Sequence, residues 1–319
     1  MRAATFFDGA TWREGVARVD DDGRMLLREV ASPAPVPRLD GVIIGGFTDH
    51  HVHLQLVEVD RLTGSRLGRV IDLGADPAVV ASYAGAARLG APRIEFAGAF
   101  LTPPGGYPSD RDWAPAGSFR EIADRTAAAS AVAEMAEAGA SCIKVSSNSD
   151  AGPVFDDDLS RAIVTLAADR GLPVVVHAQG AGEAQRAARL GARALAHAPF
   201  TERLTDDEIG RQAAALTWIS TLSIHDGAER ATAIDNVRRF HEAGGSLRYG
   251  TDMGNGPTPV DLHPGEVAAL LEAGVDGVRL LQALAPADPR DPTAPLLLLP
   301  ARDGDPRDAR ELTPDDLKA

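Results

Sequence analysis

The sequence predicts an α/β protein: a (β/α)8 (TIM) barrel to which the two ends of the chain add a small β appendage. Short apolar segments rich in β-branched residues alternate with longer alanine-rich segments of helical period. Many of the helical segments begin at Asp or Ser and end at glycine, as helices do. Strand–helix units repeated eight times favour a barrel, and 319 residues fit one barrel domain.

The strands are expected where apolar β-rich segments occur. In chain order these segments are 42–53, 69–74, 93–100, 141–147, 172–179, 192–198, 216–223 and 246–253. Helices are expected between them at 76–90, 118–139, 156–171, 181–191 and 226–245. An open doubly wound sheet is the alternative. It would usually show a glycine-rich phosphate-binding turn after its first strand, and this sequence has none.

The ends of the chain have a different character. Residues 1–42 contain strand-like pieces around the turn in VARVDDDGRMLLREV. The segment from about residue 286 is rich in Pro and Asp and has one apolar strand candidate, Leu296 to Leu299. We expect 1–42 and 286–319 to form a composite β appendage, and 43–285 to form the barrel.

Composition excludes several classes of protein. The net charge is -14 without a block of Lys or Arg, which argues against a nucleic-acid partner. A single cysteine, Cys142, excludes an internal disulfide and fits a reducing compartment. The N-terminus lacks the apolar core of a signal peptide, and the run PLLLLP is too short to span a bilayer. We therefore expect a cytoplasmic protein with no membrane partner; a homo-oligomer is compatible with the sequence.

Ionisable residues gather at the carboxyl ends of the predicted strands, where a barrel carries its active site. His51 and His53 share parity and therefore one face of the first strand, whereas His50 should point away. Later strands carry, at the same end, Lys144, His177, His197 and Asp252. Each residue alone has an ordinary structural interpretation, such as a hydrogen-bonded core histidine. Together, imidazoles and a carboxylate favour a site for a divalent cation such as zinc.

Several phrases carry a family resemblance. GGFTDHHVHLQL resembles the strand-1 signature of the amidohydrolase superfamily, a Gly-Phe-Ile/Thr-Asp-x-His-x-His phrase. IKVSS, VVVHAQG, ALAHAPF and YGTDMGNG resemble the later strand motifs of that superfamily, in the same order. PRIEFAGAFLTPPGGYP is similar to the strand-3 region of the branch related to imidazolonepropionase and Xaa-Pro dipeptidases. The resemblance covers about residues 40–285.

The resemblance implies a set of metal ligands. His51, His53 and Asp252 would hold a first metal, His177 and His197 would hold a second, and an N-carboxylated Lys144 would bridge the two. A buried lysine can lose its proton, and the free amine can then add carbon dioxide. An unmodified Lys144 would repel a second cation and leave a mononuclear site. The expected cofactor is one or two divalent ions, with Zn²⁺ the leading candidate.

The resemblance also implies a hydrolase acting on a small molecule. A metal-activated hydroxide would cleave a C–N bond in an amide, cyclic amide or dipeptide-like substrate, with Asp252 as proton acceptor and donor. A deaminase or a lactone or ester hydrolase is the alternative. Deaminases of the superfamily lack the strand-4 Lys and carry Glu shortly after the strand-5 His, whereas Glu183 lies six residues beyond His177. A catalytically inactive ligand-binding barrel is a third possibility, but no ligand residue is missing.

Other polar residues are candidates for substrate contact. They are Tyr107, Asn148, Gln179, His225, Asn255 and His263. For His225 and His263, a place in a loop at the rim is the simpler interpretation. Tyr107 and Gln179 stand where many relatives have histidine, so they bear on substrate identity. Cys142 shares parity with Lys144 and is expected to be a small buried residue.

Overall fold

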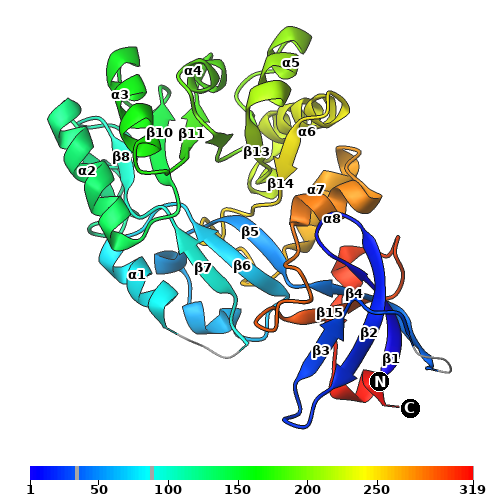
Figure 1. The fold of residues 1–319 in the computed structure, drawn as a ribbon. Coiled ribbons are helices and arrows are strands. Elements are labelled where there is room, and N and C mark those ends of the chain that lie inside the picture. The colour runs from blue at the N-terminus through cyan, green and yellow to red at the C-terminus, as the bar shows by residue number, and fades with distance from the viewer. Residues whose placement is uncertain (33–35, 87–89, 319) are drawn as a thin grey trace.

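The computed structural model describes residues 1–32, 36–86 and 90–318. Its central element is a ring of parallel strands with helices on the outside (Figure 1). The ring strands are β5 (Phe47–Val52), β6 (Leu67–Asp72), β7 (Arg93–Phe96) continued by β8 (Phe100–Thr102), β10 (Ile143–Asn148), β11 (Val174–Gln179), β12 (Ala194–Leu195), β13 (Thr217–Ile219) and β14 (Ser246–Arg248). They follow the predicted order along the chain.

Hydrogen bonds close the ring. β5, β6 and β7 form one parallel sheet, and β8 to β14 form another. The chain itself joins the two sheets between β7 and β8. On the other side, β5 meets the segment after β14 through a parallel bridge between Val52 and Met253. There the N–H of His50 donates to Tyr249 O (3.0 Å) and that of His53 to Met253 O (2.7 Å). The barrel prediction is confirmed.

The helices are α1 (Pro77–Gly85), α2 (Arg125–Ala138), α3 (Asp157–Ala168), α4 (Glu183–Arg189), α5 (Asp206–Ala215), α6 (Gly227–Glu242), α7 (Pro264–Glu272) and α8 (Gly277–Leu284). The side chains of Asp76, Asp124 and Asp156 accept backbone N–H groups at the starts of α1, α2 and α3. Short 3₁₀ turns are η1 (Leu54–Leu56), η2 (Val59–Leu62), η3 (Leu222–Ile224), η4 (Pro306–Asp308) and η5 (Pro314–Leu317). Within the predicted helix 76–90, residues 87–89 lie outside the described part of the chain.

The predicted helix 118–139 begins later than expected. Residues Phe119–Glu121 form a short strand, β9, parallel to β8, and α2 starts only at Arg125, after its cap Asp124. The prediction is therefore wrong for 118–124. The cap residue was the better signal for the start of the helix than the composition of the segment before it.

The expected strand 42–53 divides at Gly46. Its first part belongs to β4 (Arg38–Gly45), outside the barrel, and its second part is β5. A Cβ at Gly46 would lie 2.6 Å from the backbone nitrogen of Gly68 and 2.6 Å from the ring of Pro295, so only glycine fits this crossing. The Gly46 N–H donates to Pro295 O (2.9 Å), and Gly46 O accepts from the Ala287 N–H (2.9 Å).

The two chain ends form a second sheet, as predicted. β1 (Arg2–Phe7), β2 (Trp12–Val19), β3 (Met25–Arg28), β4, β15 (Leu296–Leu299) and β16 (Arg310–Glu311) pair in the order β16-β15-β4-β1-β2-β3. A separate small core, including Phe6, Ile43 and Leu298, supports this sheet. Both termini lie on it, side by side (Figure 1).

A separate buried apolar cluster is built from residues of the barrel strands and their immediate neighbours. This cluster consists of Leu73, Ala97, Cys142, Val175, Ala194, Ala196 and Ile219. Cys142 is a buried free thiol, as expected. Among the described residues, no helix has the length and apolar character needed to cross a membrane.

Candidate metal centre

Three side chains meet where β5 ends and the chain leaves β14. Oδ1 of Asp252 lies 3.1 Å from Nε2 of His51 and 3.0 Å from Nε2 of His53. The two imidazole Nε2 atoms are 3.3 Å apart. All three residues are buried, and one ligand atom from each lies within 4.8 Å of the others. Buried nitrogen and oxygen atoms that converge in this way can hold a divalent cation.

Backbone carbonyls orient both histidines. Nδ1 of His51 is 2.8 Å from Ala196 O, and Nδ1 of His53 is 3.1 Å from Gly74 O. Because a carbonyl can only accept, each ring carries its proton on Nδ1 and turns the lone pair of Nε2 toward Asp252. Lone pairs of imidazole and carboxylate that face each other at about 3 Å repel unless a cation or an extra proton lies between them. The residues present therefore fit a metal ion.

The pKa values agree with this demand for positive charge. Burial lowers the pKa of His51 to about 4. Burial also opposes the charge of His53, but the adjacent Asp252 carboxylate outweighs it and raises the pKa of His53. Although burial alone would raise the pKa of Asp252, the two imidazoles hold it well below its usual range. Asp252 is consequently ionised at neutral pH.

Asp49 joins the two segments that carry these ligands. Its Oδ1 accepts the backbone N–H groups of His51 (3.0 Å) and Thr251 (3.1 Å), and its Oδ2 accepts the Thr251 hydroxyl (2.6 Å). The sequence interpretation missed this residue. Its parity, shared with His51 and His53, was the available signal.

Asp252 has an unusual backbone. Its φ of 55° lies in the left-handed region that non-glycine residues rarely occupy. Asp252 lies four residues beyond the end of β14, and in this conformation its carboxylate faces the histidine pair. Oδ2 accepts a hydrogen bond from Nδ2 of Asn255 (2.8 Å), so Asn255 contacts the carboxylate.

The other predicted ligands lie next to this cluster. The ring of His197 is 4.8 Å from that of His51 and 4.9 Å from that of His177, centroid to centroid. Nδ1 of His197 pairs with the hydroxyl of Thr221 at 2.9 Å. Nε2 of His177 is buried and has no hydrogen-bond partner among the described residues. Such an unsatisfied buried nitrogen is expected of a metal ligand.

Lys144 is 1% exposed on the inner face of β10. Its ammonium lies 5.7 Å from the centre of the Phe100 ring, and no described carboxylate forms an ion pair with it. Burial lowers the pKa of Lys144 to about 8. Burial is the largest cause that lowers the pKa values of His51 and His177, and the positive charge of Lys144 is the second. The amine therefore lies near both rings.

Aromatic side chains surround the histidines on one side. Tyr107, in the loop after β8, stacks on His177 with ring centroids 5.1 Å apart and an interplanar angle of 26°. Trp113 and Arg111 pack against the Tyr107 ring in turn. Burial raises the pKa of Tyr107 to about 12, so its phenol stays protonated.

His225 is linked to the histidines through Phe200. Its ring stacks on Phe200 at 4.1 Å, and Phe200 stands edge-on to His197 at 6.2 Å. Burial lowers the pKa of His225 to about 4, so the ring is neutral. Its Nε2 is buried without a hydrogen-bond partner among the described residues.

The remaining candidates lie at the carboxyl ends of strands or on helix caps. Asn148 and Gln179 end β10 and β11 and bind each other, Nδ2 to Oε1, at 2.9 Å. His263 caps α7 by accepting the Glu266 N–H at Nδ1 (3.2 Å). On the outer face of β5, Nδ1 of His50 pairs with Tyr249 O at 3.0 Å, so this histidine points away from the cluster, as expected.

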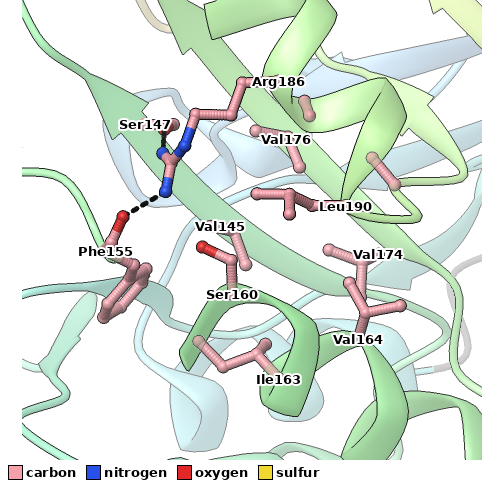
Figure 2. A pocket seen from close by; sticks show the side chains of 12 residues that line it. Val145, Ser147, Phe155, Ser160, Ile163, Val164, Val174, Val176, Arg186 and Leu190 are labelled. Atoms are coloured by element: carbon pink, nitrogen blue, oxygen red, sulfur yellow. Dashed lines mark hydrogen bonds between the residues drawn. The ribbon is translucent and has the colours of Figure 1, made fainter. Parts of the chain in front are cut away.

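Glu183 lies away from the metal cluster. Its Oε2 accepts the hydroxyl of Ser147 (2.5 Å) and lies 3.4 Å from Nη1 of Arg186. Ser147 and Arg186 border a small apolar cavity between β10, β11 and helices α3 and α4, on the outer side of the strands (Figure 2). Arg186 also donates to Phe155 O there. The Glu183 carboxylate therefore interacts with residues under the outer helices and does not face the metal cluster.

No protein-family model and no curated protein shows a significant match to the sequence. The fold, in contrast, matches solved structures. A protein from Bifidobacterium longum assigned as a prolidase has a TM-score of 0.72 at 22% identity, with 94% of this chain and 88% of that chain covered. A Xaa-Pro dipeptidase with bound methionine has a TM-score of 0.69 at 18% identity, covering 95% and 93% of the two chains. For a structure described as an amidohydrolase, the TM-score is 0.67 at 18% identity, with coverage of 99% and 94%. The chain therefore has the fold of these solved structures, one of which is described as an amidohydrolase, the superfamily that its strand motifs resemble.

Proposed function

We propose that this protein is a metal-dependent hydrolase that cleaves a C–N bond in a small amide, cyclic amide or dipeptide-like molecule. One observation carries the proposal. The Nε2 atoms of His51 and His53 and Oδ1 of Asp252 face one another at 3.0–3.3 Å, while both Nδ1 atoms are committed to carbonyls. This arrangement of buried acceptors favours a bound cation, and the carboxyl ends of the strands are where barrel enzymes carry their active sites.

The neighbouring residues support a binuclear centre. His177 and His197 would hold a second ion beside the first. With its pKa lowered to about 8, Lys144 has more free amine at neutral pH than an ordinary lysine, about a tenth of the molecules, and this amine can add carbon dioxide. The carbamate would give the two cations a shared anion in place of a repelling ammonium. Zn²⁺ suits a site in which imidazole nitrogens predominate.

A bound divalent ion supplies a lowered pKa for water and a polarised substrate carbonyl. The proton transfers are assigned to Asp252. Its carboxylate is ionised; Oδ1 faces the two histidines as a ligand, and Oδ2, which Asn255 orients through a hydrogen bond, would take the proton of the attacking water. The protonated carboxyl then donates to the leaving nitrogen. His51 and His53 would not compete for this proton while their Nε2 atoms hold the metal and their Nδ1–H groups donate to carbonyls.

The alternatives differ in how well they fit. A deaminase would need a second carboxylate near His177, but Glu183 is bonded to Ser147 on the outer side of β10. A lactone or ester hydrolase uses the same proton transfers and differs only in its leaving group. We assign the catalytic barrel to the expected residues 43–285 less the end of β4, so that it begins after Gly46, and we assign the preceding residues and 286–319 to the appendage. We further propose that the protein acts on a small-molecule substrate in the cytoplasm and forms a homo-oligomer.

Metal analysis and a substrate screen test this function. Purified protein should contain one to two equivalents of zinc or a similar ion. Metal-reconstituted protein should hydrolyse a member of a panel of acyl-amino acids, dipeptides, lactams and arylamides faster than matched esters, lactones or aminopurines. Adjacent histidines give a matched control, since His51→Asn should lose metal and His50→Asn should keep it. The absence of metal after reconstitution would refute the proposal.

A further inference from the structure

Thr221, which pairs with His197, has a strained backbone. Its φ and ψ of 44° and 37° are left-handed, a conformation that β-branched residues rarely adopt. The residue is fully buried. Its N–H donates to Gly250 O at 3.0 Å, and its Oγ1 lies 2.9 Å from Nδ1 of His197. A strained residue of this kind persists only where its surroundings hold it.

The carboxylate of Glu266 provides that hold. Its Oε1 accepts the N–H of Leu222 (2.9 Å) and its Oε2 the N–H of Ser223 (2.7 Å), the two residues that follow Thr221. Glu266 is 0% exposed, and no described Lys or Arg forms an ion pair with it. Its carboxylate is thus used to fix the turn η3 against α7.

Helix α7 is itself anchored near the barrel. The imidazole of His263 caps it, and the N–H of His263 donates to the Tyr249 hydroxyl at 2.8 Å. Tyr249 is buried and directly follows β14. The position of Glu266 is therefore fixed relative to the strand ends that carry the metal cluster.

We propose that Glu266 is a positioning residue for His197. By holding the backbone of Leu222 and Ser223, it keeps Thr221 in the conformation in which the hydroxyl accepts the Nδ1 proton of His197 and frees Nε2 for a metal. The inference rests on the proposed function, because it takes His197 to be a ligand of the second metal. It adds that a helix outside the strand ring controls the affinity of that one site.

Substitutions at Thr221 separate this role from a purely structural one. Thr221→Gly relieves the left-handed strain but removes the hydroxyl, so it should melt at or above the temperature of the wild-type protein. The second equivalent of metal should nevertheless bind about 10- to 100-fold more weakly, as for loss of other hydrogen-bond partners of ligating histidines. Thr221→Ser keeps the hydroxyl and should retain near-wild-type affinity. Affinities are measured by chelator competition, with the first equivalent as internal control.

The link to Glu266 is tested by a double-mutant cycle. In Glu266→Gln the amide N–H₂ faces one of the two backbone N–H groups and cannot accept its hydrogen bond. This variant should therefore bind the second equivalent of metal more weakly and the first unchanged, as Thr221→Gly does. Because Glu266 acts through Thr221, the double variant should be little worse than Thr221→Gly. Where Glu266→Gln does not fold, Glu266→Asp, which shortens the carboxylate, takes its place. Additive losses, or unchanged affinity in Thr221→Gly, would overturn the proposal.

A metal-free measurement distinguishes failure of this inference from failure of the proposed function. The side-chain ¹⁵N shifts of His197 report which nitrogen carries the proton. They should show an Nδ1 proton in the wild type and in Thr221→Ser, and a mixture of tautomers in Thr221→Gly and in Glu266→Gln. Wild-type protein that binds no metal but shows these shifts would contradict the hydrolase and leave the positioning role supported. Identical shifts in all four proteins would contradict the positioning role.

Discussion

The two halves of the candidate centre are anchored in different ways. The Nδ1–H groups of His51 and His53 donate hydrogen bonds to main-chain carbonyls. Asp49 accepts backbone N–H groups of His51 and Thr251 and so fixes the segment that carries Asp252 next to the histidines. In the other half, His197 pairs with a side-chain hydroxyl, whereas within the described part of the chain Nε2 of His177 has no hydrogen-bond partner and Lys144 is buried without an ion pair. The fold thus preassembles the first half, whereas the second half depends on what binds to it.

Replacement of Asp252 should have the largest effect on the preassembled half. Asp252→Asn keeps the shape and one ligand oxygen, but an amide cannot accept the proton of the attacking water. We expect kcat to fall about 10²- to 10⁴-fold, with folding and much of the metal retained. Asp207→Asn, on the exposed face of α5, is the matched control and should be neutral. Near-normal turnover of Asp252→Asn would move the base to His225 or His263.

Replacement of Lys144 should impair metal binding only in the second half of the centre, formed by Lys144, His177 and His197. Lys144→Ala should lose the second metal equivalent and most activity, because the bridging anion is gone. Formate, acetate or bicarbonate should restore part of both by filling the vacated space. Lys144→Arg should not respond to them, since guanidinium neither adds carbon dioxide nor leaves room. If Lys144→Ala keeps both metal equivalents, the lysine is only structural.

Replacement of Lys144 should raise the stability of the metal-free protein even though it lowers metal binding and activity. A buried ammonium without an ionic partner is unfavourable, and an apolar side chain of similar length removes that penalty. Lys144→Met should therefore stabilise the metal-free protein by about 1–3 kcal/mol, measured by urea unfolding, while it abolishes the second metal site. Destabilisation instead would mean that the ammonium interacts favourably with its surroundings.

The smallest expected effect concerns His50, which lies next to the centre but faces away from it. Burial lowers its pKa from 6.5 to about 3, so between these values the unfolded chain binds a proton that the folded protein does not. Stability therefore falls as pH drops below 6.5. His50→Asn should flatten this acid dependence by up to about 1.4 kcal/mol per pH unit in the metal-free protein. An unchanged slope in denaturant titrations would contradict a neutral buried imidazole.

The contrast between the halves also separates what the sequence could predict from what it could not. Strand parity placed His51 and His53 on one face and His50 on the other, and the order of the strands placed the remaining ligand candidates. Asp49, Thr221 and Glu266 escaped prediction because most of their partners are distant in sequence and come close only in the folded chain. The division at Gly46 was hidden because apolar residues of two different sheets adjoin without a polar break.

The Gly46 crossing determines when the centre can form during synthesis of the chain. The segment that carries His51 emerges early, but Gly46 is held by Ala287 and Pro295, and β4 pairs with β15. The partners of His51 and Asp49 likewise come late, at Ala196 and Thr251. Contacts between such distant parts of a chain form slowly and only after the later part exists. A ribosome-bound fragment that ends before Ala196 and Thr251 therefore lacks the groups that orient the first histidines, and we expect metal to bind only the finished chain.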